Sequence, residues 1–171
     1  MRAKMGPNLM RRSILARSLG LAVASTGLWA QSLTIPPSLV TRGSYGSLLL
    51  TLSAPPGKAP VALQWEFTFP PNVTVELADI GAGSAAESAK KNLTCIALKG
   101  TKEAGKSSAF ACILAGGQKP LPDGPIAIVR YSVPKEIREI PEKVQVGKAM
   151  GATADLKSVQ IESAQAAIVV K

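Results

Sequence analysis

Residues 61–69, VALQWEFTF, alternate between two kinds of side chain, and this alternation restricts the fold more than any other feature of the chain. Every second residue is apolar: Val61, Leu63, Trp65, Phe67 and Phe69. The residues between them are small or polar: Ala62, Gln64, Glu66 and Thr68. Because side chains point alternately to the two faces of a β-strand, one face would enter a core and the other would meet water or a partner.

Similar short apolar segments recur along the chain, separated by turns rich in Pro, Gly and Asn. The pattern predicts strands at 32–35, 46–52, 61–69, 73–80, 92–97, 109–114, 125–133, 144–150, 158–161 and 166–170. Short strands at this spacing are typical of an all-β sandwich or barrel rather than of a parallel α/β sheet. Two short helices are also expected, at 83–91 and 135–139.

A second alternating segment, 126–133, supplies more of the expected core. We assign to the core the set that contains an aromatic ring: Ala127, Val129, Tyr131 and Val133. The other set is expected at the surface: Ile126, Ile128, Arg130 and Ser132. Val73, Val75 and Leu77 should continue a buried face, and Phe110, between two alanines, should also be buried. Tyr45 is the aromatic residue expected to stay exposed.

The first thirty residues have the layout of an export signal. Five basic residues and no acid lie in the first 17, an apolar run follows at 18–30, and the polar residues Gln31 and Ser32 come next. Such a run is too short to span a bilayer as a stable helix. We expect residues 1–30 to be a signal peptide cut after Ala30; an uncleaved N-terminal anchor is the alternative. Residues 31–171 would then form a single exported domain.

The high net charge belongs partly to this N-terminal segment. The chain has 20 basic and 11 acidic residues, a net charge of +9; without the five basic residues of the signal, 15 against 11 leaves +4. Five lysines do cluster: Lys90, Lys91, Lys99, Lys102 and Lys106. Acids lie among them and aromatic side chains do not, whereas surfaces for nucleic acids usually combine basic and stacking groups. A solvated lysine-rich loop, and no nucleic-acid partner, is the expectation.

The two cysteines, Cys95 and Cys112, are an even number in a chain with an export signal. Such a pair usually forms a disulfide in an oxidising compartment, so we expect a Cys95–Cys112 bond. The alternative is two buried free thiols.

The residues needed for several common chemistries are missing. The chain has no histidine, which removes Ser-His-Asp and Cys-His nucleophilic sites and the commonest zinc ligand. It has neither a CxxC pair nor a phosphate-binding glycine motif. The acids are spread singly, so a calcium site or a glycosidase pair of carboxylates would require distant segments to meet. We therefore expect no enzyme activity, no cofactor and no metal.

Three segments of the chain resemble one superfamily of β-sandwich domains. They are VALQWEFTFPPNVTVELADIGAGSAAESAKKNLTCIAL, GPIAIVRYSVP and AQAAIVVK. They are similar to strands of cohesin-like and carbohydrate-binding-module domains, most of all to cohesin-like domains found singly in exported bacterial proteins. The resemblance covers about residues 32–171 and implies a nine-stranded, jelly-roll-type β-sandwich with a non-catalytic binding role. The cysteine pair and the lysine-rich loop depart from cellulosomal cohesins, and there is no dockerin-type calcium repeat.

The resemblance also implies a candidate binding surface. In cohesins the face that binds the partner includes the outer side of the strand that matches 61–69, which implies a role for Gln64, Glu66 and Thr68. Ile128, Arg130 and Ser132, on a strand expected to lie nearby, are further candidates. The alternative is that all six are ordinary solvent-facing residues.

Three functions follow from the resemblance. The first is an exported, non-catalytic, cohesin-like module that mediates protein–protein interaction at the cell surface or in the periplasm. The second is a carbohydrate-binding module for a polysaccharide, which would need an exposed row of aromatic rings or a calcium-lined groove. The third is a structural subunit of a surface assembly, which would need an unpaired apolar edge strand. Few aromatic rings are predicted at the surface, so the protein-binding hypothesis ranks first.

Overall fold

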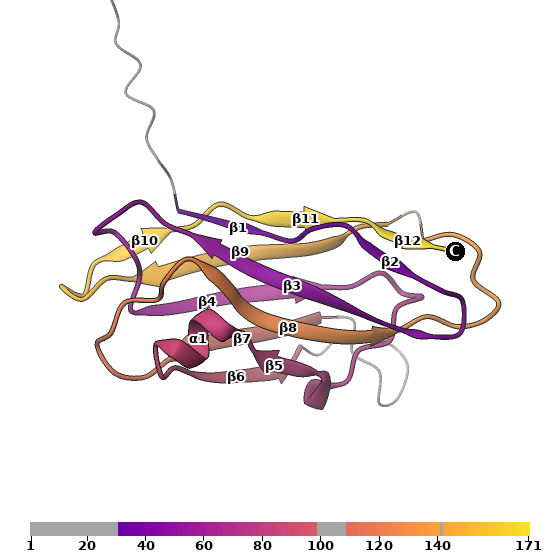
Figure 1. Ribbon diagram of the computed structural model, residues 1–171, viewed down its shortest axis with the longest axis horizontal. Coiled ribbons are helices and arrows are strands. Elements are labelled where there is room, and N and C mark those ends of the chain that lie inside the picture. The colour runs from indigo at the N-terminus through magenta and orange to yellow at the C-terminus, as the bar shows by residue number, and fades with distance from the viewer. Residues whose placement is uncertain (1–30, 99–108, 141) are drawn as a thin grey trace, which may run out of the picture.

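The alternating segment at 61–69 forms strand β4 (Ala62–Thr68), in the middle of the larger of two packed sheets (Figure 1). The computed structural model describes residues 31–98, 109–140 and 142–171. The expected signal peptide, 1–30, and three of the five clustered lysines, within 99–108, lie outside the described residues. The described part of the chain is an all-β, jelly-roll-like sandwich, which confirms the predicted fold class.

The larger sheet has the strand order β10–β9–β4–β7–β6, and β11 also pairs with β9. Its other strands are β6 (Asn92–Ala97), β7 (Ala109–Ala115), β9 (Val144–Ala152), β10 (Ser158–Gln160) and β11 (Ala164–Ala166). The smaller sheet has the order β1–β3–β8–β5 and lies nearer the viewer in Figure 1. It is formed by β1 (Ser32–Thr34), β3 (Tyr45–Ser53), β5 (Ile80–Ala82) and β8 (Gly124–Ser132).

The sandwich has more strands than the nine that the resemblance implies. The described residues contain twelve. The predicted strand at 32–35 ends before Pro36 and Pro37, which lack the N–H that a sheet ladder requires, and a strand that no predicted segment covers follows them. The part before the prolines, β1, pairs with β3, and the part after them, β2 (Ser38–Val40), pairs in parallel with β12 (Ile168–Val170). At the end of the chain, the predicted segment 166–170 covers β12 and only the last residue of β11.

The core lies between the two sheets and contains the rings that the alternation predicts. Trp65 and Phe67 are buried and meet edge to face, with their ring centres 6.0 Å apart. Phe69 and Phe110 are also buried and meet edge to face. The predicted inward set of β8 faces them from the smaller sheet: Ala127, Val129, Tyr131 and Val133, all buried. Such close-packed aromatic and aliphatic burial is the main force that holds the layers together.

The prediction that Ile126 lies at the surface is wrong, because a short helix covers the start of β8. Helix α1 (Ser84–Ser88) packs against β8, and the Gly83 N–H donates to the Ile126 carbonyl over 3.0 Å. A Cβ on Gly83 would lie 2.4 Å from the Pro125 carbonyl oxygen, so glycine is needed for this approach. Both faces of β8 are therefore covered at this end, and Ile126 is fully buried.

Two other predicted elements differ in the structure. Val73 and Val75 are buried, but Leu77 is 46% exposed at the start of a 3-10 turn, η1 (Leu77–Asp79), rather than in a strand. The Asp79 side chain accepts from the Glu76 N–H in a capping box that stabilises this turn. The expected helix at 135–139 does not form; after Pro134 there is a single turn, closed by the Ile137 N–H to the Pro134 carbonyl.

The Tyr131 side chain connects β8 of the smaller sheet to β2 by a hydrogen bond. Its buried hydroxyl lies 2.7 Å from the Ser38 Oγ, which also donates to the Ser47 carbonyl. Burial raises the pKa of Tyr131, since the charged phenolate would lose its hydration. A Cβ on Gly46 would lie 2.4 Å from the Tyr131 ring, so glycine makes room for the ring.

Lys91 is an exception to the predicted solvated lysine cluster. Its Nζ donates to the Gly116 carbonyl over 2.6 Å and to the Gly117 carbonyl over 3.0 Å, and the residue is buried. Burial lowers the pKa of Lys91. Its ammonium thus ties the start of β6 to the glycine turn that follows β7.

Candidate functional site

The outer surface of the larger sheet carries the first three candidate residues. Gln64, Glu66 and Thr68 project from β4 on the side away from the core. They are in register with Ile113, Ala111 and Ala109 of β7, respectively, and β7 is in turn in register with β6. These three strands place their outward side chains in rows that cross the sheet.

The second set of candidates does not join the first. Ile128, Arg130 and Ser132 lie on β8, in the smaller sheet, so their outward side chains face the opposite side of the sandwich. Ile128 is in register with Leu49 of β3, and the Arg130 guanidinium lies 5.9 Å from the centre of the Tyr45 ring. The prediction that the two sets lie near each other is wrong, because the chain changes sheets between β7 and β8. The alternation of apolar and polar residues cannot reveal such a change.

The rows on the larger sheet surround a hollow of about 330 Å³, called here the β7 hollow. Its lining combines outward side chains of four strands with two bordering core residues: Gln64, Trp65, Glu66, Thr94, Ile96, Ala111, Cys112, Ile113 and Lys148. One row runs from Glu66 through Ala111 to Ile96, each residue in register with the next. Ala111 is short and stands between two longer side chains, so the surface is depressed there.

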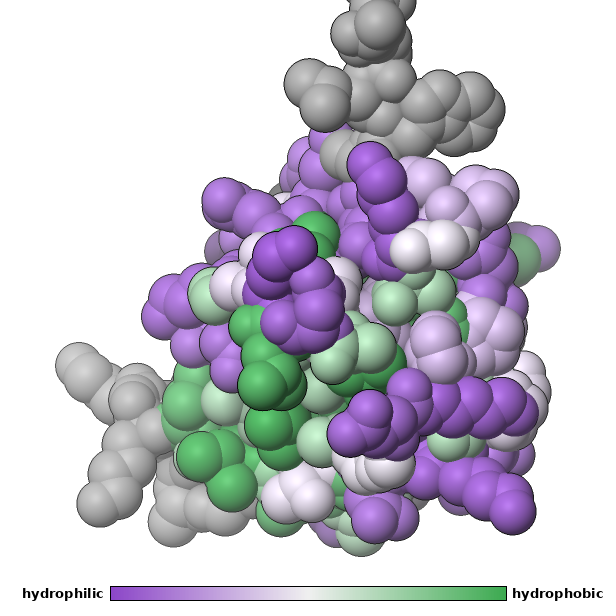
Figure 2. Space-filling view, turned by 90° about the vertical axis from the view of Figure 1, so that its left-hand side faces the viewer, coloured by the Kyte–Doolittle hydropathy of each residue, from purple (hydrophilic) through white to green (hydrophobic). Residues whose placement is uncertain are grey.

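Exposed apolar side chains surround this hollow. Ile96, Ile113 and Met150 are each between 44% and 60% exposed, and all three project from strands of the larger sheet. Leu156, in the turn between β9 and β10, is also exposed. Figure 2 shows hydrophobic side chains gathered on one side of the molecule. Large apolar residues grouped on a surface are typical of interaction sites, whereas scattered single ones are ordinary.

An ion pair borders the hollow on the β4 side. The Lys148 Nζ lies 3.0 Å from each carboxylate oxygen of Glu66. The Lys148 side chain is 77% exposed and the Glu66 side chain only 28% exposed. The ammonium is therefore the member of the pair that a partner would meet first.

A β-bulge places Lys148 in this position. Gln64 pairs with Met150 and Glu66 pairs with Gly147, so Lys148 and Ala149 together face Trp65. Lys148 has a φ of 50°, in the left-handed region that L side chains rarely adopt. The extra residue keeps Val146 and Ala149 in the core while Lys148 projects outward.

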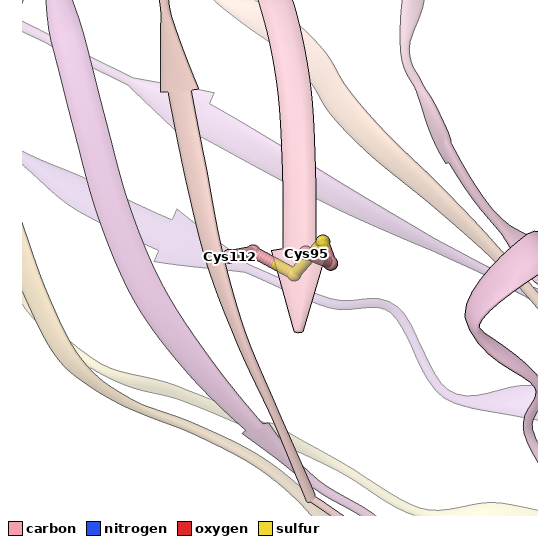
Figure 3. The surroundings of a disulfide bond; sticks show 2 residues. All are labelled: Cys95 and Cys112. Carbon is pink, nitrogen blue, oxygen red and sulfur yellow. A yellow bond between two sulfur atoms is a disulfide. The ribbon is translucent and has the colours of Figure 1, made fainter. Parts of the chain in front are cut away.

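The predicted disulfide is present beside the hollow. Cys95 and Cys112 are directly opposite one another on β6 and β7, with their Cα atoms 4.1 Å apart (Figure 3). Since β6 is the outermost strand of the larger sheet, the bond attaches this edge to the strand that forms the floor of the hollow. Thr94 and Ile96, on either side of Cys95, are held in register with Ile113 and Ala111.

Five residues of this site were not predicted from the sequence: Thr94, Ile96, Ala111, Ile113 and Lys148. The first four are outward positions of predicted strands, and period two applied to 92–97 and 109–114 could have found them. Lys148 could not be found in this way, because the bulge shifts the alternation of β9 by one residue.

Neither a metal site nor a membrane-spanning helix appears in the part of the chain that the structure describes. No group of three or more acidic or cysteine side chains there could hold a metal ion. No helix there is long and apolar enough to cross a bilayer. The groups that this surface presents are apolar side chains, an ammonium and hydrogen-bonding side chains.

Several solved structures have a fold similar to this sandwich. A non-cellulosomal cohesin from the archaeon Archaeoglobus fulgidus is similar, with a TM-score of 0.61 and 14% identity over 82% of this chain and 91% of that one. The fold is cohesin-like. A type I cohesin–dockerin complex from Clostridium thermocellum gives 0.62 and 13%, over 82% and 99% of the chains. The third cohesin ScaC of Acetivibrio cellulolyticus, in complex with a ScaB dockerin, gives 0.61 and 17%, over 81% and 99%.

No protein-family model and no curated protein matches the chain. At identities of 13–17%, the likeness to cohesins establishes the fold, and the function must be argued from the surface.

Proposed function

We propose that this chain is an exported, non-catalytic cohesin-like module that binds another protein through the outer face of its larger sheet. The observation that carries the proposal is the β7 hollow, with Ile96 and Ile113 exposed beside it and the Glu66–Lys148 pair at its border. Protein interfaces combine a central apolar pocket with a polar rim in this way. Two of the similar solved structures are cohesins in complex with dockerin proteins.

The aromatic residues favour a protein over a polysaccharide. Sites for polysaccharides on β-sandwiches often use exposed rings, but the described residues place Trp65, Phe67, Phe69, Phe110 and Tyr131 in the core. Tyr45 carries the one exposed aromatic ring among the described residues, and it lies on the smaller sheet, away from the hollow.

Export is part of the proposal. The charged and apolar pattern of residues 1–30 favours it, as does the disulfide, because such bonds persist in oxidising compartments. We place the module in the periplasm or at the cell surface.

Two isoleucines provide a matched test. Ile113 is 46% exposed on the larger sheet and Ile128 is 37% exposed on the smaller one, both on central strands. A photo-crosslinking amino acid would replace each in turn in the full chain, expressed in the native host. Crosslinked proteins would be identified by mass spectrometry. We expect a discrete protein adduct at position 113 that is absent at position 128.

Charge reversal and a polysaccharide panel complete the test. Lys148→Glu, which breaks the ion pair and reverses the exposed charge, should abolish the adduct at position 113. Equal crosslinking at both positions, or retention on polysaccharide with no protein adduct, would overturn the proposal.

A further inference from the structure

The β7 hollow has room for a side chain, but not for a large ligand. At about 330 Å³ it lies at the lower limit of small-molecule pockets, which span roughly 300–1,000 Å³. Ile96, Ala111 and Ile113 make its floor and one wall apolar. Binding energy in protein interfaces concentrates where one partner inserts an anchor side chain into such a pocket. An aliphatic anchor matches this lining.

The ion pair offers a donor beside the anchor. Glu66 is the more covered member, and both of its carboxylate oxygens lie 3.0 Å from Lys148 Nζ. The Lys148 ammonium has three N–H donors and no acceptor, and it projects toward the solvent. A partner group that meets it must accept hydrogen bonds, and a carboxylate does so most strongly. A partner cation would be repelled.

The backbone indicates that this placement of Lys148 has a cost. Its left-handed φ of 50° would suit glycine better, and Gly147 is the adjacent residue. Unfavourable backbone conformations of this kind cluster at functional sites. The bulge explains the shift in register between β4 and β9, but it does not require a lysine. The lysine at position 148 supplies the cation on this face.

From these observations we infer that the partner inserts an aliphatic side chain into the β7 hollow and places a carboxylate next to it, against Lys148. This inference rests on the proposed function and specifies the chemistry of the partner: an acidic, aliphatic surface, such as a helix with Leu, Ile or Val beside Asp or Glu.

A display library tests this chemistry even while the partner itself is unidentified. The probe is a phage-displayed library of helical hairpins with one randomised face, selected on the full chain with Cys95 and Cys112 oxidised. Ala111→Trp fills the hollow, and Ser47→Trp adds the same ring to the outer face of the smaller sheet as a matched control. The double variant Glu66→Lys with Lys148→Glu exchanges the two charges.

We expect the enriched hairpins to combine an aliphatic residue with a neighbouring acid. Ala111→Trp should weaken their binding at least about tenfold, the loss typical of a removed anchor, and Ser47→Trp should leave it unchanged. Selection on the charge-exchanged variant should yield Lys or Arg in place of the acid.

The failure of this inference and that of the proposed function give different results. Hairpins that still bind Ala111→Trp, or that carry basic or uncharged residues beside the aliphatic one, would overturn the inference. If these hairpins lose binding to Ile113→Lys, the outer face of the larger sheet, the docking face, would still be supported as the binding surface. If no enriched hairpin responds to Ile113→Lys, both the inference and the docking face are overturned.

Discussion

The two outer faces of the sandwich arise from the same alternation but offer different surfaces. On the smaller sheet, exposed Leu49 and Ile128 are cross-strand neighbours, and the Arg130 guanidinium lies 5.9 Å from the centre of the Tyr45 ring. On the larger sheet, Ala111 interrupts the row of longer side chains and leaves a hollow. Exposed apolar residues alone therefore do not make a docking site; on the larger sheet, Ala111 gives the face its hollow and the β9 bulge gives it the Lys148 cation.

Removal of the disulfide should have the largest effect on this comparison, because it joins two strands of the larger sheet. For the double variant Cys95→Ala with Cys112→Ala we expect a loss of roughly 3 kcal/mol in the free energy of unfolding, from the entropy gained by the unfolded chain. Urea unfolding would measure it, with the reduced wild type as a control. If the bond also restrains the edge strand in the folded state, amide exchange should increase more in β6 and β7 than in β3 and β8; equal increases would show that the bond acts on the unfolded chain alone.

Tyr131 tests the smaller sheet. Tyr131→Phe removes the hydrogen bond to Ser38 and should lower the free energy of unfolding by about 1 kcal/mol. Tyr45→Phe, at an exposed ring of the same sheet, should change it by much less. Thermal or urea unfolding of the two variants provides the measurement. Equal losses would contradict the role given to the buried hydroxyl.

Lys148 tests whether the docking face carries backbone strain. Lys148→Gly and Lys148→Ala both remove the ion pair, but only glycine relieves the left-handed φ. The glycine variant should therefore be the more stable of the two by about 1 kcal/mol, while both lose the partner's contact with the ammonium. Urea unfolding compares the two; an alanine variant as stable as the glycine one would exclude strain at this position.

The smallest expected effect is a pH dependence of the smaller sheet. Burial raises the folded-state pKa of Tyr131, so the folded protein keeps this proton at a pH where the unfolded chain loses it. The stability contribution is present below the unfolded pKa of about 10 and is lost as the pH rises through the higher folded-state value. Above pH 10, the free energy of unfolding measured with urea should decrease less steeply with pH for Tyr131→Phe than for the wild type. Identical slopes would contradict the assignment.

Much of the fold could be predicted from local pattern. The alternation in 61–69 and 126–133 identified the buried rings and the all-β class, and the strand at 92–97 has the predicted bounds. Two of the errors arise from tertiary contacts: Ile126 is covered by α1, and Lys91 is buried against a distant glycine turn. A third is local, because a capped 3-10 turn places Leu77 outward.

The candidate site could be predicted only in part. The outward positions of β4 follow from period two, as do the unused positions of β6 and β7. That β8 lies in the other sheet follows from the path of the chain between β7 and β8, which depends on long-range packing. A disulfide between Cys95 and Cys112 could be expected from their number, but not that it joins directly opposed residues beside the hollow.

The sequence alone specified which side chains enter the core in β4 and in β8 beyond Ile126, because period-two alternation is a local property of extended chain. It also determined that the chemistry at the surface must come without histidine. The tertiary structure decided which strands are neighbours, where β9 bulges, and that Ala111 stands between Glu66 and Ile96. These depend on the pairing of segments far apart in the chain, and no local pattern specifies that pairing.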